Sequence, residues 1–400
     1  MVTWIHRLVK KERLVLKTID QLPMRKKIGD LAFATISDVH LCHPRVPISR
    51  LLATINRFFP DNDLTGELDY ILVAGDLFDR LRTLADNEVY AVMDFMMYWL
   101  AMLKERGVRL RVLEGTPSHD RNQSELVVRI NNALGEKGCD LRYVDVLKID
   151  HEEEFGINIL YVPDEWRGET DQTWQEVREL MRQQRLDSVD IAVMHGMFGH
   201  QLPNGIMRDH HKASNYESIV NWFITVGHIH SSSNYGKIFA QGSPDRLSHN
   251  EEEAKGIFKF VVTPENNAVV SKFVENDDAT PFVTLDLVGL DMDPAMQIIK
   301  NKLDEISYGN IRLLVDGKLF GDGILDSATD LAGEKEIIWS KKVEKQKIKE
   351  GQDDSATMMA LDLPSINKNT ITGLTHSYAE RQGYAPGAIT VALELLEEYK

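Results

Sequence analysis

The sequence is poor in cysteine: its 400 residues include only two, Cys42 and Cys139. Two cysteines cannot build a disulfide framework or a thiolate zinc cluster. Any metal site in this chain must therefore use histidine and carboxylate ligands. The scarcity of cysteine also favours the reducing cytoplasm as the compartment of this protein.

Long apolar runs are also missing. The most apolar segment, residues 89–103, is interrupted by Asp94 and is too short to span a bilayer. The amino-terminal residues contain no apolar core of the kind that a signal peptide carries. We therefore expect a protein that is neither secreted nor membrane-spanning, with no membrane among its partners.

Positive charge is in deficit, because the formal net charge is −16. This charge argues against a protein whose whole surface coats nucleic acid. It leaves a nuclease with a local basic groove open, since many of the carboxylates can be metal ligands or part of a solvated face.

What is present is an alternation of short apolar strands and amphipathic helices from residue 31 to about residue 230, which predicts an α/β fold. Three consecutive strands separated by turn residues follow, over 257–263, 268–274 and 282–288, and they predict an antiparallel addition. A helix over 296–306 and a strand over 311–315 then indicate a small α/β module.

The length predicts two or three domains. We divide the chain into an amino-terminal extension (1–30), a main α/β domain (31–264), a smaller capping or substrate-specificity domain (265–340) and a charged linker with a helical tail (341–400). The tail has apolar residues at helical spacing over 389–399, which would suit packing on a partner or on the body of the protein. The lysines of 341–349 are interleaved with glutamate, so they form either a DNA-binding patch or a solvated face.

The most informative stretch is residues 71–79, an apolar run that stops at Gly75-Asp76. It predicts a buried parallel strand that delivers a carboxylate at its carboxyl end, where open α/β sheets bind their ligands. The other expected strands end in side chains of the same kind: Asp38, His40, Asp79, His119, Asp120, His195, His228 and His230. Each cluster alone is a weak signal, but their order along successive strand ends predicts a centre with mixed carboxylate and imidazole ligands.

This ordered set resembles the calcineurin-like metallophosphoesterases, with Asp-x-His, Gly-Asp-x-x-Asp, a His-Asp pair, a histidine after a strand and Gly-His-x-His over about residues 31–235. The resemblance implies a β-sandwich flanked by helices in four layers (α/β/β/α), with a smaller α/β capping domain. It also implies roles for individual residues. The first metal would be held by Asp38, His40 and His230, the second by His195 and His228, and Asp76 would bridge the two.

The resemblance further implies that His119 is the catalytic histidine, and we group Asp79 with it as a candidate catalytic residue behind the metal ligands. A carboxylate at a helix start is the alternative for Asp79. The sequence departs from the family in one place: Ser118 aligns with the asparagine that binds the second metal. A serine hydroxyl is a weaker neutral ligand than an amide oxygen, and Asn122 or a water molecule are alternatives for this position.

Two divalent ions bound in this way polarise a phosphoryl group and activate water. Carboxylate and imidazole ligands without thiolate fit manganese best, with iron or zinc as alternatives. The sequence therefore predicts a metal-dependent phosphoesterase, a hydrolase acting on ester bonds.

A second resemblance concerns residues 242–248, 251–253 and 255–256, which resemble the segment after Gly-His-x-His in SbcD-type DNA repair exonuclease subunits. It implies a DNA exonuclease or endonuclease acting in DNA repair or recombination, an SbcC-type ABC ATPase as partner and a homodimer. Two alternatives stay open. One is a phosphatase or phosphodiesterase acting on a small molecule or nucleotide, and the other is a metal-degenerate scaffold, supported by Ser118, that binds a partner without catalysis.

Overall fold

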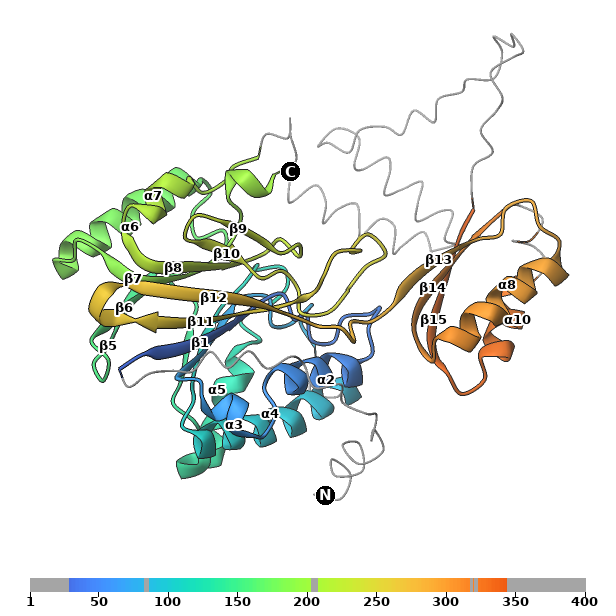
Figure 1. Ribbon diagram of the computed structural model, residues 1–400, viewed down its shortest axis with the longest axis horizontal. Helices are drawn as coiled ribbons and strands as arrows, with labels where there is room; N and C mark the ends of the chain where they lie inside the picture. The colour runs from blue at the N-terminus through green and yellow to red at the C-terminus, as the bar shows by residue number, and fades with distance from the viewer. Residues whose placement is uncertain (1–28, 83–85, 203–207, 317–318, 320–322, 344–400) are drawn as a thin grey trace, which may run out of the picture. The chain divides into compact units, whose positions relative to one another are not determined.

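The computed structural model describes residues 29–82, 86–202, 208–316, 319 and 323–343. Nearly all of the expected extension over 1–30 and most of the expected tail, including the stretch over 389–399, lie outside these residues. The described chain is a mixed α/β protein whose three sheets are flanked by helices (Figure 1).

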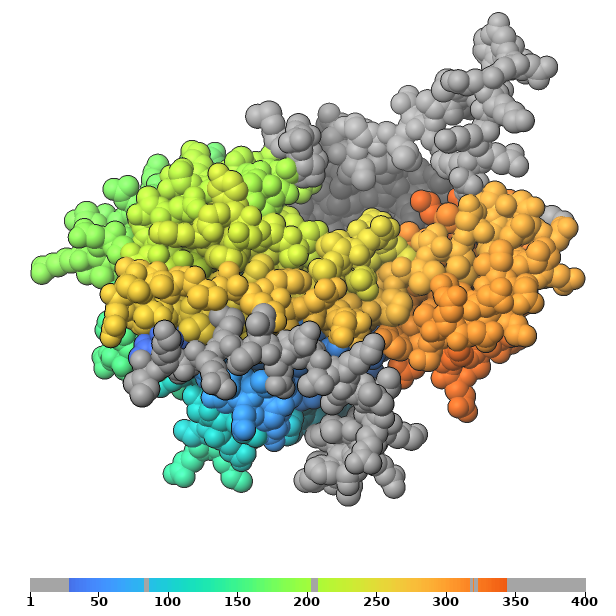
Figure 2. Space-filling view, in the orientation of Figure 1, coloured from blue at the N-terminus to red at the C-terminus, as the bar shows by residue number. Residues whose placement is uncertain are grey.

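The first sheet contains most of the strands predicted in the amino-terminal half. Its order is β12 (Ala268–Glu275), β11 (Gly256–Thr263), β1 (Leu31–Ile36), β2 (Tyr70–Ala74), β3 (Arg109–Leu113) and β4 (Leu141–Val144). Strands β1 to β4 run parallel, and β11 and β12 add an antiparallel edge, as the turn residues predicted. Strand β12 forms one edge of this sheet, and it lies on the face seen in Figure 2 as part of a gold band.

The second sheet has the same mixed character. Its order is β5 (Lys148–Glu152), β6 (Ile157–Val162), β7 (Val189–His195), β8 (Val220–Gly227), β10 (Ile238–Ala240) and β9 (Ser233–Tyr235). The inner strands β6, β7, β8 and β10 are parallel, with β5 and β9 antiparallel at the two edges. In each sheet, therefore, the carboxyl ends of several parallel strands lie at the same end of the sheet.

The two sheets pack face to face through an aromatic core. Phe223 of the second sheet stacks on Phe260 of the first with ring centroids 4.0 Å apart, and Phe33 meets Phe223 edge-on at 5.5 Å. Alternate residues of each strand point to opposite faces, so Phe33 enters this core while Ala34 and Ile36 face the helices. The sandwich therefore aligns the strand ends of both sheets.

Helices cover the two outer faces of the sandwich (Figure 1). The first sheet is covered by α2 (Ile48–Phe58), α3 (Asp63–Gly66), α4 (Asn87–Arg106) and α5 (Glu125–Leu134), and the second by α6 (Thr170–Gln184) and α7 (Ala213–Glu217). Short 3-10 helices occupy Gly135–Lys137, Gly199–Gln201 and Pro264–Asn266. The order of layers is thus helix, sheet, sheet, helix, as expected.

Local signals in the sequence set the limits of α4. The Asp86 side chain caps its first turn by accepting a hydrogen bond from the Glu88 amide, and Gly107 ends it in the left-handed conformation. Its buried residues pack against α2, α5 and the first sheet, whereas Tyr90, Met97 and Tyr98 are exposed. Among the described residues, no helix is long and apolar enough to cross a membrane.

A third, three-stranded sheet forms a separate small α/β layer. Strands β13 (Phe282–Asp286), β14 (Tyr308–Val315) and β15 (Glu336–Val343) are parallel, and α8 (Met292–Glu305) and α10 (Ile324–Ala332) pack on them. The expectation that residues 282–288 continue the antiparallel run is wrong. Strand β13 pairs with β14 instead, because α8 provides the crossover that parallel strands need.

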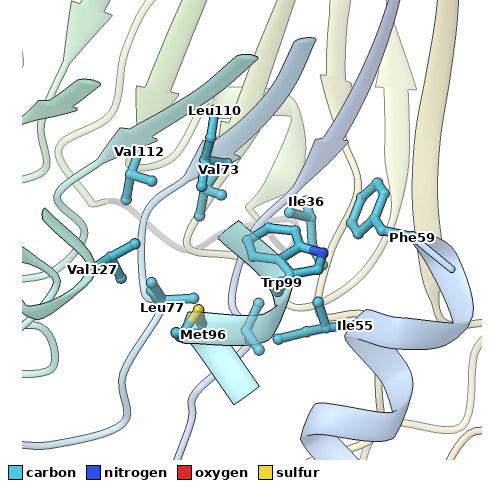
Figure 3. Close-up of a pocket in the computed structure, with 11 residues that line it drawn as sticks. Ile36, Ile55, Phe59, Val73, Leu77, Met96, Trp99, Leu110, Val112 and Val127 are labelled. Atoms are coloured by element: carbon cyan, nitrogen blue, oxygen red, sulfur yellow. The ribbon is translucent and has the colours of Figure 1, made fainter. Parts of the chain in front are cut away.

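The pocket shown in Figure 3 lies between the first sheet and its helices, and every residue that lines it is apolar. Val39 and Leu77 belong to this lining, directly beside Asp38 and Asp76 in the chain. Without convergent polar groups the pocket has no features of a binding site. It is core packing that supports the strand ends from behind.

Candidate metal centre

The expected side chains meet at the aligned carboxyl ends of the sandwich strands. Asp38 and Asp76 come just after β1 and β2, His195 ends β7, and His228 follows β8. The two loops of the first sheet are tied together by backbone bonds, from the Asp38 amide to the Gly75 carbonyl and from the His40 amide to the Asp76 carbonyl, both 3.1 Å. The parallel strands therefore bring residues that are far apart in the sequence into one cluster.

The backbone of this cluster is strained. Asp38, His40, Asp76 and His228 have positive φ angles of 52°, 50°, 49° and 99°. Such angles are uncommon outside glycine and persist where the surrounding structure enforces them, which happens most often at functional sites. The strain points to a function for these strand ends beyond packing.

Two glycines let the loops approach closely enough. A Cβ on Gly75, whose φ is +84°, would lie 2.2 Å from Nδ1 of His195. A Cβ on Gly115 would lie 2.1 Å from the Asp76 amide nitrogen and 2.3 Å from its Oδ1. The close approach of Asp76 and His195 therefore requires glycine at both positions.

The first group of candidate ligands consists of Asp38, His40 and His230, whose donor atoms lie within 4.8 Å of one another. Nε2 of His40 and Nε2 of His230 face each other at 3.1 Å. Each imidazole has a carboxylate on its other side: Asp79 Oδ1 lies 3.6 Å from His40 Nδ1, and Glu251 Oε1 lies 3.2 Å from His230 Nδ1. Carboxylates in this position orient histidines that bind metals.

Asp76 lies between this group and the next. Its Oδ2 is 3.6 Å from Nε2 of His40, and its Oδ1 is 3.3 Å from Nε2 of His195. Burial acts to raise the pKa of Asp76, but the neighbouring imidazoles and the Thr116 amide hold that pKa well below its usual range. Asp76 is thus an anion with one oxygen turned toward each set of histidines.

The second group contains His195 and His228 together with Asp164, whose donor atoms also lie within 4.8 Å of one another. His195 donates from Nδ1 to the Ala74 carbonyl at 2.6 Å, so Nε2 is the ring nitrogen that faces the cluster. Burial lowers the pKa of His195, but Asp76, Asp38 and Asp164 outweigh it and raise that pKa well above its ordinary value.

Thr116 lies inside the second group. Its hydroxyl oxygen is 3.0 Å from Asp164 Oδ2, 3.3 Å from both His195 Nε2 and His228 Nδ1, and 3.4 Å from Asp76 Oδ2. Its amide also donates to Asp76 Oδ1 at 2.6 Å. Thr116 is buried, with 8% of its surface exposed.

His119 and Asp79 lie beside the first group. His119 donates from Nδ1 to the Asp79 carbonyl oxygen at 2.8 Å, and its ring lies 4.9 Å from the ring of His40. This bond fixes the tautomer that keeps Nε2 of His119 free for a reacting group. Burial tends to raise the pKa of the Asp79 side chain, but His40 and Arg80 lower it to about 2.

Asp120, next to His119, has a role in holding the loops. Its oxygens accept from the Phe78 and Gly115 amides, both at 2.8 Å. Burial, and then the charge of Glu114, raise the pKa of Asp120 to about 7. It connects the loop after β2 to the loop after β3 and is not among the residues that face the cluster.

The expectation for Ser118 differs from the structure. Ser118 is exposed, and Asn122, the alternative, directs its amide toward Tyr143 and Asp145. Thr116 takes the place in the second group that was expected for Ser118. The reason is the turn at residues 116–119, where the His119 amide bonds to the Thr116 carbonyl and carries Ser118 outward.

Three contributors were missed from the sequence: Thr116, Asp164 and Glu251. Asp164 follows β6, an apolar strand, so the strand-end pattern that indicated Asp76 could also have indicated Asp164. Glu251 belongs to the segment that carried the second resemblance, but only its contact with His230 shows what it does.

The donor set fits divalent cations. Ligands about 2.0–2.2 Å from an ion, at bond angles near 90–110°, lie roughly 3.0–3.6 Å from one another. The separations of 3.1 Å between His40 and His230 and of 3.3 Å between Asp76 and His195 fall in that range. The buried histidines and aspartates can therefore hold a metal ion.

Comparison with known proteins adds little to this picture. No family model matches the sequence, and no curated protein matches it. One similar solved structure is that of TT1561 of Thermus thermophilus, which is 12% identical with a TM-score of 0.36; the alignment covers 61% of this chain and 99% of that one. Another solved structure is 10% identical with the same TM-score and the same coverage. Similarity at this level carries no functional conclusion, so the functional proposal depends on the geometry of the site.

Proposed function

We propose that this protein is a two-metal phosphodiesterase of the metallophosphoesterase class. The observation that carries the proposal is the position of Asp76, with one carboxylate oxygen toward His40 and the other toward His195. A single carboxylate between two sets of imidazoles is the arrangement that bridges a pair of cations. Asp38, His40 and His230 would hold one ion, and His195 and His228 the other.

Divalent ions held there, with manganese favoured by the ligand types, supply Lewis-acid activation of a phosphate and of water. His119 is the residue of this chain that acts on the reacting atoms. As water adds to phosphorus and the P–O bond to the leaving group breaks, the imidazolium form of His119, with protons on both Nδ1 and Nε2, would donate its Nε2 proton to the departing oxygen. The proton released by the attacking water balances the one that His119 gives up. Asp79 keeps both His119 and His40 in place, through its carbonyl and its carboxylate respectively.

The substrate would enter from the side of the two histidines after β8. His228 and His230 have 26% and 31% of their side chains exposed, against 0% for His195 and 3% for His40. These exposures favour approach from the side of His228 and His230. A phosphodiester presented there would meet His119 and both groups together.

We further propose that the substrate is DNA and that the protein works with an SbcC-type ATPase. The segment that suggested this, residues 242–256, lies against the site in the structure, because Glu251 contacts His230 and Lys255 donates to the His230 carbonyl at 2.9 Å. The net charge of −16 favours the rival substrate class, a small-molecule phosphodiester. The scaffold alternative depended on Ser118, and the donors of Thr116 and Asp164 now weaken it.

The test is manganese-dependent hydrolysis by the full chain of labelled linear duplex DNA and of bis-p-nitrophenyl phosphate. Loss of DNA degradation in Asp76→Asn, with no loss in a variant of the exposed Arg129, would support the nuclease. Cleavage of the small ester alone would favour the small-molecule enzyme. If the chain bound manganese but hydrolysed neither the DNA nor bis-p-nitrophenyl phosphate, the proposal would be contradicted.

A further inference from the structure

The second group contains a carboxylate and a hydroxyl that the sequence motifs did not assign. Asp164 lies in the loop after β6 with 12% of its side chain exposed, and its Oδ2 is 3.3 Å from Nδ1 of His228. In the described part of the chain, the ion-pair partner of Asp164 is His228, and no described lysine or arginine pairs with this largely buried anion.

The hydroxyl of Thr116 has an unusual environment. Its four polar neighbours, on Asp76, Asp164, His195 and His228, lie between 3.0 and 3.4 Å away. A hydroxyl donates one hydrogen bond and accepts two, so it satisfies at most three neighbours, and the two carboxylates among the four both need its single proton. Four neighbours at nearly equal distance need another explanation.

Metal coordination provides one. In a six-coordinate ion with bonds of about 2.1–2.2 Å, each ligand lies roughly 3.0–3.1 Å from its four nearest fellow ligands. The Thr116 hydroxyl has that relation to Asp164, His195 and His228, apart from a few tenths of an ångström. Asp76 Oδ1, which lies 3.3 Å from His195 Nε2, adds a fifth donor and leaves one position for water or substrate.

We propose that Asp164 and Thr116 are ligands of the second ion, in the place where the sequence led us to expect Ser118. This inference rests on the proposed two-metal function. It adds a third carboxylate, after Asp38 and Asp76, to the centre, and an anionic oxygen binds a hard cation more strongly than a neutral amide or hydroxyl does. The second ion is therefore held firmly in this protein, and the departure from the family pattern is compensated.

The test is calorimetric titration of the metal-stripped full chain with Mn²⁺. We expect the unmodified chain to bind two ions. Asp164→Ala should lose the second ion or bind it at least about 100-fold more weakly. A loss of affinity that large exceeds the loss usually caused by removing a hydrogen bond that only supports a metal ligand. Thr116→Val should also weaken the second ion, while the matched Thr116→Ser, which keeps the hydroxyl, should retain it. Circular dichroism shows whether each variant is folded.

The visible absorption of bound Co²⁺ distinguishes a metal ligand from a residue that only supports a ligand. If Asp164 binds the ion, Asp164→Asn alters the visible absorption of the second Co²⁺, because a ligand has changed. An unchanged spectrum, second-ion affinity within 100-fold in Asp164→Ala, or loss of the ion in Ser118→Ala would overturn the inference. Failure of the unmodified chain to bind two ions would instead contradict the proposed function.

Discussion

The two groups of candidate ligands are supported in different ways. In the first group, His40 and His230 are each oriented from outside by a carboxylate, Asp79 and Glu251. In the second group, His195 is held by a backbone carbonyl, and the extra carboxylate, Asp164, lies among the donor atoms. In the proposed centre, the first site would depend on the residues behind its candidate ligands, whereas the second would depend on an additional charge inside it.

Asp76 belongs to both groups, so its removal should have the largest effect. Asp76→Asn keeps the shape of the side chain but removes the charge that faces His40 and His195. We expect both ions to be lost and hydrolysis to fall at least about 10³-fold, since metal ions contribute several kcal/mol and 1.36 kcal/mol is a factor of ten. Metal analysis and steady-state rates measure both effects, and retention of both ions at full affinity would contradict the bridging role.

His119 lies outside both groups as a ligand, so its removal should separate chemistry from metal binding. His119→Ala is expected to lower the rate by about 10²–10⁴, the usual contribution of a general acid. Both manganese ions should remain bound with unchanged affinity. Hydrolysis rates at saturating manganese and a manganese titration, both measured on His119→Ala and on the unmodified chain, test these two expectations. If the variant hydrolysed at the full rate, His119 would have no role in catalysis.

Glu251 supports only the first group, so it should affect one ion. Glu251→Gln weakens the orientation of His230, and we expect the first ion to bind about 10–100-fold more weakly while the second is unchanged. Glu253→Gln is the matched control, because Glu253 pairs with Lys255 at 2.9 Å and is not paired with His230. If both ions weakened equally in Glu251→Gln, the two groups would not be independent.

The same contrast explains what the sequence could predict. The ligands of the first group, and Asp76, His195 and His228, follow apolar runs as short motifs, and parallel topology brings such strand ends together. The order of layers and the limits of α4 were predictable for the same local reasons. The pairing of β13 was not, because whether a strand extends one sheet or starts another depends on tertiary packing.

The second group shows where local patterns stop being informative. Thr116 and Ser118 are both hydroxyl residues next to Pro117, and only the turn that follows decides which of them faces inward. Asp164 is distant in the chain from the other ligands, and β6 and β7 must pair before it reaches them. Glu251 acts through a contact that crosses from one loop to another.

An anomalous difference map from crystals grown with Mn²⁺ would show whether two ions lie on either side of Asp76. We predict two peaks, one among Asp38, His40 and His230 and one among His195, His228, Asp164 and Thr116, with Asp76 contacting both. A single peak, or peaks away from Asp76, would contradict the proposal of a two-metal centre bridged by Asp76.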